Sequence, residues 1–139
     1  FKLISFFKEL MTIKTTDIGS IKVGGYIIID GTACRVVSVQ TSKTGKHGHA
    51  KARIEAIGLI NDDKKVIVKP SHDKADVPIV EKKSAQVLSV NNDVANVMDT
   101  ETFETFDIKI PEELKGKVQE NSNVIFWIIL GIKVLKQMK

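Results

Sequence analysis

Apolar and polar residues alternate with a period of two in two stretches of the chain, residues 32–39 and 51–60, and both are rich in β-branched side chains. This alternation is typical of half-buried β-strands and not of amphipathic helices. The run that joins them, residues 41–51, carries three lysines, two histidines and two glycines and almost nothing apolar. Such a run has nothing to bury in a core. The sequence therefore predicts a long β-hairpin with a basic, exposed loop.

The charges of this loop suggest what it meets. Gly45 and Gly48 bracket Lys46 and His47, and glycine takes positive φ without steric cost, so the chain can turn sharply and present Lys46 at the tip. No acidic residue occurs between Asp30 and Glu55. The same interval holds five fixed positive charges: Arg35, Lys43, Lys46, Lys51 and Arg53. Two interpretations follow, a loop that is merely solvated or a loop that binds an external anion.

Two other kinds of site fit the loop poorly. His47 and His49 are spaced to share a metal ion, but a metal site needs three or four ligands and the neighbouring residues are lysines. Gly45 and Lys46 are similar to the end of a phosphate-binding P-loop, yet His47 stands where that motif requires serine or threonine. Neither a metal centre nor a nucleotide site is expected here.

The loop and four other segments together carry a resemblance to a known family. They are Ser42-Lys43-Thr44-Gly45-Lys46-His47-Gly48-His49-Ala50-Lys51, Gly25-Tyr26-Ile27-Ile28-Ile29-Asp30-Gly31, Cys34-Arg35-Val36-Val37, Asp76-Val77-Pro78-Ile79-Val80-Glu81-Lys82-Lys83 and Met98-Asp99-Thr100-Glu101-Thr102-Phe103-Glu104-Thr105-Phe106. These segments resemble the translation initiation factor 5A family, the archaeal and eukaryotic relatives of bacterial elongation factor P. The resemblance extends over residues 12–137, in the order expected of the family.

The resemblance implies that Lys46 becomes hypusine or deoxyhypusine. Deoxyhypusine synthase would transfer an aminobutyl group from spermidine to its ε-nitrogen, and the resulting rod with two amines could enter a narrow cleft walled by RNA. In the family that cleft is the peptidyl-transferase centre, where the rod lies against the acceptor end of peptidyl-tRNA. The residues expected to contact ribosomal RNA or tRNA are Lys43, Thr44, Gly45, Lys46, His47, Gly48, His49, Lys51 and Arg53.

The resemblance implies that the protein assists the ribosome, whose catalytic centre is made of RNA, and is not itself a catalyst. The chain contains no Ser-His-Asp set, no paired catalytic carboxylates and no cofactor loop, so an enzyme, a cofactor and a metal are not expected. A factor of this family would hold a poorly reactive peptidyl-tRNA in a productive pose on the ribosome, and positioning alone lowers a barrier substantially. The alternative is a two-barrel RNA-binding module that acts through charge alone, with Lys46 unmodified.

Charge and cysteine content fit an RNA partner in the cytoplasm. Residues 1–76 hold 13 Lys or Arg against 8 Asp or Glu, a balance of +5, whereas residues 77–139 hold 8 against 9, a balance of −1. The basic excess thus lies in the half with the loop. Cys34 is the only cysteine and is expected to be a small buried hydrophobe. No apolar run has the length of a membrane span, and neither a membrane nor DNA is an expected partner.

The strand pattern predicts an all-β protein of two barrels. Residues 1–11 are expected to be an N-terminal extension, residues 12–75 an SH3-like barrel that carries the basic hairpin, and residues 76–139 an OB-fold domain. The first barrel has further strands at 26–30 and 65–69. The second has strands at 77–81, 85–90, 94–98, 105–110, 124–130 and 132–135, with a short helix at 111–116.

The aromatic residues of the second half have two readings. Phe103, Phe106, Phe126 and Trp127 could stack on bases, as OB-folds allow, but their strand spacing favours core packing for most of them. Residues 125–130 lack the period-two alternation of the other strands, where relatives tend to carry acids and a tyrosine. This last hairpin is therefore expected to be buried on both faces or to pack against a partner.

Overall fold

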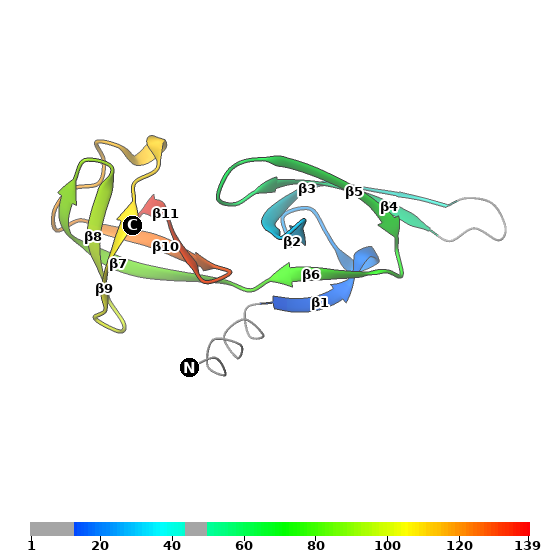
Figure 1. Ribbon diagram of the computed structural model, residues 1–139, viewed down its shortest axis with the longest axis horizontal. Coiled ribbons are helices and arrows are strands. Elements are labelled where there is room, and N and C mark those ends of the chain that lie inside the picture. The colour runs from blue at the N-terminus through cyan, green and yellow to red at the C-terminus, as the bar shows by residue number, and fades with distance from the viewer. Residues whose placement is uncertain (1–12, 44–49) are drawn as a thin grey trace. The chain divides into compact units, whose positions relative to one another are not determined.

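The computed structural model describes residues 13–43 and 50–139, and it divides the chain into two compact units, residues 1–79 and 80–139. Each unit is built from antiparallel strands (Figure 1), and each has its own apolar core. The architecture predicted from the sequence, an SH3-like barrel followed by an OB-fold, is confirmed. No helix within the described ranges has the length and apolar character needed to cross a membrane.

The first unit consists of two sheets. Strands β2 (Tyr26–Ile29), β3 (Thr32–Ser42), β4 (Lys51–Gly58) and β5 (Lys64–Pro70) form one sheet in that order, and β1 (Ile13–Asp17) pairs with β6 (Lys74–Pro78) in the other. A single 3-10 turn, η1 (Ile18–Ser20), follows β1. Inward-facing residues of the strands, together with Ile18 of η1 and the following Ile21, make the core, which comprises Ile18, Ile21, Ile27, Ile29, Cys34, Val36, Ala52, Ile54, Ala56 and Ala75.

The second unit is one curled sheet. Its strands lie in the order β11 (Ile132–Met138), β10 (Asn123–Ile129), β7 (Val80–Asn91), β8 (Val94–Asp99) and β9 (Thr105–Lys109), and β11 also contacts β9, so the sheet bends round on itself. The curl encloses a core of Ala85, Val87, Ala95, Val97, Ile108, Ile110, Leu114, Val118, Val124, Phe126 and Leu135.

Three details differ from the expected element pattern. The units divide between Ile79 and Val80, and β6 pairs with β1, so residues 76–78 lie in the first unit and not in the second. The two strands expected at 77–81 and 85–90 are instead the end of β6 and one long strand, β7. The expected helix at 111–116 is only a 3-10 turn, η2 (Glu112–Leu114), because so few residues cannot sustain α-helical hydrogen bonding.

The aromatic residues take three different positions. Phe126 is fully buried and meets the half-buried Phe106 edge to face, with ring centroids 5.1 Å apart. Trp127 lies on the opposite side of β10, where the ammonium groups of Lys82 and Lys136 cover its ring at 4.6 and 5.0 Å. Phe103 is 70% exposed, so it is not one of the aromatic residues that pack in the core.

The last hairpin is buried unevenly along β10. Val124, Phe126 and Ile129 are buried, whereas Ile125, Trp127 and Ile128 are half-buried. The expectation of burial on both faces is therefore not met, since each buried residue of β10 is next to one that is only half-buried or exposed.

Candidate functional site

The two strands of the predicted hairpin, β3 and β4, are present and pair with each other up to the residues that flank the loop. We call the end of the β3–β4–β5 sheet next to the loop the arm. The register of β3 and β4 places Gln40 opposite Arg53 and Ser42 opposite Lys51. On its other side, β4 pairs with β5 up to the pair Lys51 and Pro70 (Figure 1). Three hydrogen-bonded strands thus support the arm as far as the residues where the loop begins and ends.

Alternation along β4 sorts its side chains between the two faces. Ala52, Ile54 and Ala56 are buried in the core, so the residues between them project from the opposite face of the sheet. Lys51 and Arg53 are two of these, and both are exposed. Lys43, directly after β3, is exposed as well. The strand pattern therefore places three of the predicted RNA-binding residues on the surface at this end of the sheet.

Arg53 differs from the two lysines because it has an acidic partner. Its Nη1 donates to Oε1 of Glu55 at 2.6 Å, and Nζ of Lys64 lies 3.9 Å from Oε2 of the same carboxylate. The hydrogen bond from Arg53 and then the charge of Lys64 lower the pKa of Glu55. The interval between Asp30 and Glu55 contains no acid, yet Arg53 within it is neutralised by Glu55 at its end. Glu55, the first acid after the acid-free interval, faces Arg53 because the two are separated by one residue on a strand.

Lys51 and Lys43 form no ion pair within the described ranges. Lys69 is a further exposed cation of the arm that sequence reasoning missed. It lies opposite Ala52, so it projects from the other face of the sheet from Lys51. The lysine-rich composition of β5 carries this signal, but the alternation of its residues predicts only a strand. Cations consequently project from both faces of the arm near its end.

The remaining predicted site residues lie outside the described ranges. These are Thr44, Gly45, Lys46, His47, Gly48 and His49. Their part in the site stays a prediction. The structure establishes the flanks, Ser42 and Lys51, between which they are connected.

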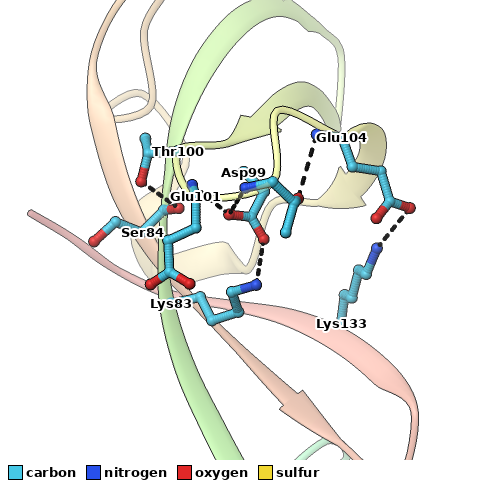
Figure 2. A network of polar contacts seen from close by, with 8 residues as sticks. Lys83, Ser84, Asp99, Thr100, Glu101, Glu104 and Lys133 are labelled. Atoms are coloured by element: carbon cyan, nitrogen blue, oxygen red, sulfur yellow. Dashed lines mark hydrogen bonds and ion pairs between the residues drawn. The ribbon is translucent and has the colours of Figure 1, made fainter.

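A second polar constellation lies in the other unit, around the buried carboxylate of Asp99 (Figure 2). Nζ of Lys83 lies 2.6 Å from Oδ2, and the backbone N–H groups of Glu101 and Thr102 donate to Oδ1 at 2.8 and 3.3 Å. Burial of the carboxyl raises its pKa, but these hydrogen bonds outweigh burial and the pKa of Asp99 is lowered. Sequence reasoning missed this network, because nothing in the local pattern shows that Lys83 turns inward.

The exposed cations of the arm can bind an anion. No group of three or more histidine, cysteine, aspartate or glutamate side chains in the part of the chain that the structure describes could hold a metal ion. Cys34 is buried, as expected, and burial raises the pKa of its thiol, which disfavours the reactive thiolate. The arm, with its exposed lysines, is the feature best suited to contact a polyanion.

Comparison with known proteins gives a consistent result. Residues 12–73 match the family described as "Translation initiation factor 5A-like, N-terminal". The chain is 46% identical over 122 residues to translation initiation factor 5A of Archaeoglobus fulgidus, a match that covers 88% of this chain and 95% of the relative. The protein of that name from Sulfurisphaera tokodaii is 42% identical over 131 residues, with 93% and 100% covered.

The likeness extends to three dimensions. The solved structure of eukaryotic translation initiation factor 5A from Methanococcus jannaschii superposes with a TM-score of 0.85 at 37% identity, covering 92% of this chain and 96% of that one. A family protein from Naegleria fowleri superposes with a TM-score of 0.78 at 31% identity and covers 92% of this chain.

Proposed function

Because the chain belongs to the translation initiation factor 5A family, we propose that it is a translation factor that binds the ribosome and positions peptidyl-tRNA in the peptidyl-transferase centre. Lys46, carrying a spermidine-derived aminobutyl group added by deoxyhypusine synthase, is the residue that reaches the acceptor end. The protein itself supplies no bond-making chemistry. It acts in the cytoplasm, relieving stalls at poorly reactive peptidyl-tRNAs.

The observation that supports the proposal best is the register of the arm. Strand pairing continues to Ser42 opposite Lys51, with β5 backing the arm to Pro70. A paired arm can hold its connecting loop away from the core, as a probe of a narrow cleft requires. Lys43, Lys51 and Lys69 would contact phosphates along the sides of the cleft. Arg53 would do so only by exchanging Glu55 for a phosphate.

The competing function is an RNA-binding module in which Lys46 stays unmodified and charge alone provides affinity. Mass spectrometry of the Lys46 peptide, from protein purified from its own source, separates the two. An added aminobutyl group supports the factor, and a bare lysine favours the module.

Activity provides the second test. Lys46→Arg keeps a positive charge but cannot accept the same modification, so the variant should fail to accelerate synthesis through consecutive prolines in a reconstituted translation system. Lys22→Arg, the same change at an exposed lysine that is not among the predicted RNA contacts, should retain activity. Equal activity of both variants would contradict the proposed role of Lys46. Catalytic turnover by the isolated protein that Lys46→Arg abolishes would instead indicate an enzyme.

A further inference from the structure

Phe103 is the most exposed large hydrophobic side chain among the described residues, at 70%, and its φ is +63°. Neither property has a folding rationale. An exposed phenylalanine gains little from burial, and a bulky residue at positive φ is an outlier that costs stability. Phe103 also lies outside the core cluster of its unit. Features of this kind persist at functional sites, where the surrounding structure holds them in place.

Several hydrogen bonds hold the turn that contains Phe103; those of the Asp99 side chain are drawn in Figure 2. The backbone N–H of Phe103 donates to the carbonyl of Asp99 at 2.8 Å, and the N–H of Asp99 donates to the carbonyl of Glu104 at 2.9 Å. Inside the turn, the Asp99 carboxylate accepts the N–H groups of Glu101 and Thr102. Lys83 anchors that carboxylate to β7. The aromatic ring is therefore presented by a turn that is organised before any partner arrives, which reduces the entropy lost on binding.

The charges beside Phe103 indicate the class of partner. Glu101 and Glu104 are exposed on either side of it; Glu104 lies 3.5 Å from Nζ of Lys133, and the charge of Glu101 acts on the ammonium of Lys83. Exposed carboxylates repel the phosphates of RNA and attract lysine and arginine. Trp127 of the same unit differs from Phe103 in this respect, because lysines and not carboxylates lie beside it: Lys82 and Lys136 cover its ring.

We propose that Phe103 is a docking residue that inserts into an apolar pocket of a protein whose rim carries lysine or arginine side chains. Buried aromatic anchors of this kind dominate the energetics of many interfaces. Glu101 and Glu104 would pair with the cations of the rim. The proposed partner is a ribosomal protein, so this inference rests on the proposed function. The contact is made by the second unit and is separate from the contacts of the Lys46 loop.

The test is site-specific photocrosslinking on purified ribosomes, with p-benzoylphenylalanine at position 103. A covalent product with a ribosomal protein is the expected result. A product with ribosomal RNA, or no product from chains that do bind ribosomes, would overturn the inference while leaving the proposed function intact. Failure of the unsubstituted protein to bind ribosomes at all would overturn both.

Variants separate docking from a structural role. Phe103→Asn removes the ring and suits the left-handed backbone, so thermal stability should be kept or raised while ribosome affinity falls at least about tenfold. Phe103→Tyr should retain affinity. Ile132→Thr alters another exposed apolar residue of the same unit, 52% exposed, and should leave affinity unchanged. A stability loss for Phe103→Asn without any loss of affinity would show that the ring serves only the fold.

Discussion

Nζ of Lys83 lies 2.6 Å from Oδ2 of Asp99, and both side chains are largely buried, with 15% and 6% of their surfaces exposed. Removing one member of such a pair leaves an uncompensated charge. Asp99→Ala should therefore lower the free energy of unfolding of the second unit by about 3 kcal/mol. Urea unfolding followed by the fluorescence of Trp127, the only tryptophan, measures this unit selectively.

The double variant Lys83→Met with Asp99→Ala serves as the control for that prediction. It should be less destabilised than Asp99→Ala alone, because no buried ammonium remains. Glu112→Gln, which removes an exposed partner of Lys115, should change stability little. Additive effects of the Lys83 and Asp99 changes would contradict coupling between the two side chains.

The stability of the second unit should depend on pH through the same pair. The folded-state pKa of Asp99 is lowered, so its contribution is complete above the unfolded pKa of about 4 and is lost as pH falls through the lower folded value. The pKa of Lys83 is raised, mainly by the hydrogen bond to Asp99, so its contribution is lost only at strongly alkaline pH. Urea midpoints should show a plateau from about pH 5 to 9 and fall below about pH 4, less steeply in Asp99→Ala.

Glu55 should restrain the affinity of the arm for RNA, because it occupies the guanidinium of Arg53. Glu55→Gln releases that cation for one more phosphate contact. Affinity for a single-stranded RNA oligomer should rise, and the slope of log K against log salt should steepen by about 0.7. Glu81→Gln removes an exposed carboxylate from the other unit and is the matched control. Equal slopes for the two variants would contradict a role for the Arg53 pair.

Cys34 should report the unfolding of the first unit. Its side chain is fully buried, and burial raises the pKa of the thiol, so little thiolate forms in the folded protein. A thiol reagent such as Ellman's reagent should react slowly under native conditions at pH 8 and rapidly in denaturant. Rapid stoichiometric labelling of the native protein would be inconsistent with the described burial.

The contact between the Lys82 ammonium and the Trp127 ring should contribute to the stability of the second unit. The ammonium of Lys82 lies 4.6 Å from the ring centroid, and exposed cation–π contacts contribute about 0.5–1 kcal/mol. Lys82→Met keeps much of the side-chain length but removes the charge. The free energy of unfolding measured in urea should therefore fall by about 0.5–1 kcal/mol, the contribution of the cation–π contact. An unchanged midpoint would indicate that the contact contributes nothing measurable.

Much of the architecture was predictable because burial alternates along the strands. The buried residues Ala52, Ile54 and Ala56 are separated by outward-facing ones, and this period alone identifies β4. The expected break between strands at 77–81 and 85–90 is wrong, because β7 runs unbroken from Val80 to Asn91. Lys83 is inside, since Asp99 on the neighbouring strand neutralises it, and one residue's partner across a sheet is not visible in a single sequence.

The sequence predicts which charged side chains the candidate site exposes better than it predicts which of them form ion pairs. Residue types alone identified Lys43 and Lys51 as exposed cations. The ion pair between Arg53 and Glu55 depends on two side chains sharing one face of β4, and the exposure of Phe103 depends on a turn with positive φ. Both properties arise from tertiary geometry, which strand periodicity does not specify.

The three-stranded arm also limits how its reach can change over evolution. Because side chains alternate between faces, removing a single residue from β4 beyond Ile54 would turn Lys51 toward the opposite surface. Removing two from each of β3 and β4 would instead keep every orientation and shorten the arm by roughly 7 Å. The length of the arm can therefore change without reversing its side chains only when residues are added to or removed from each strand in pairs.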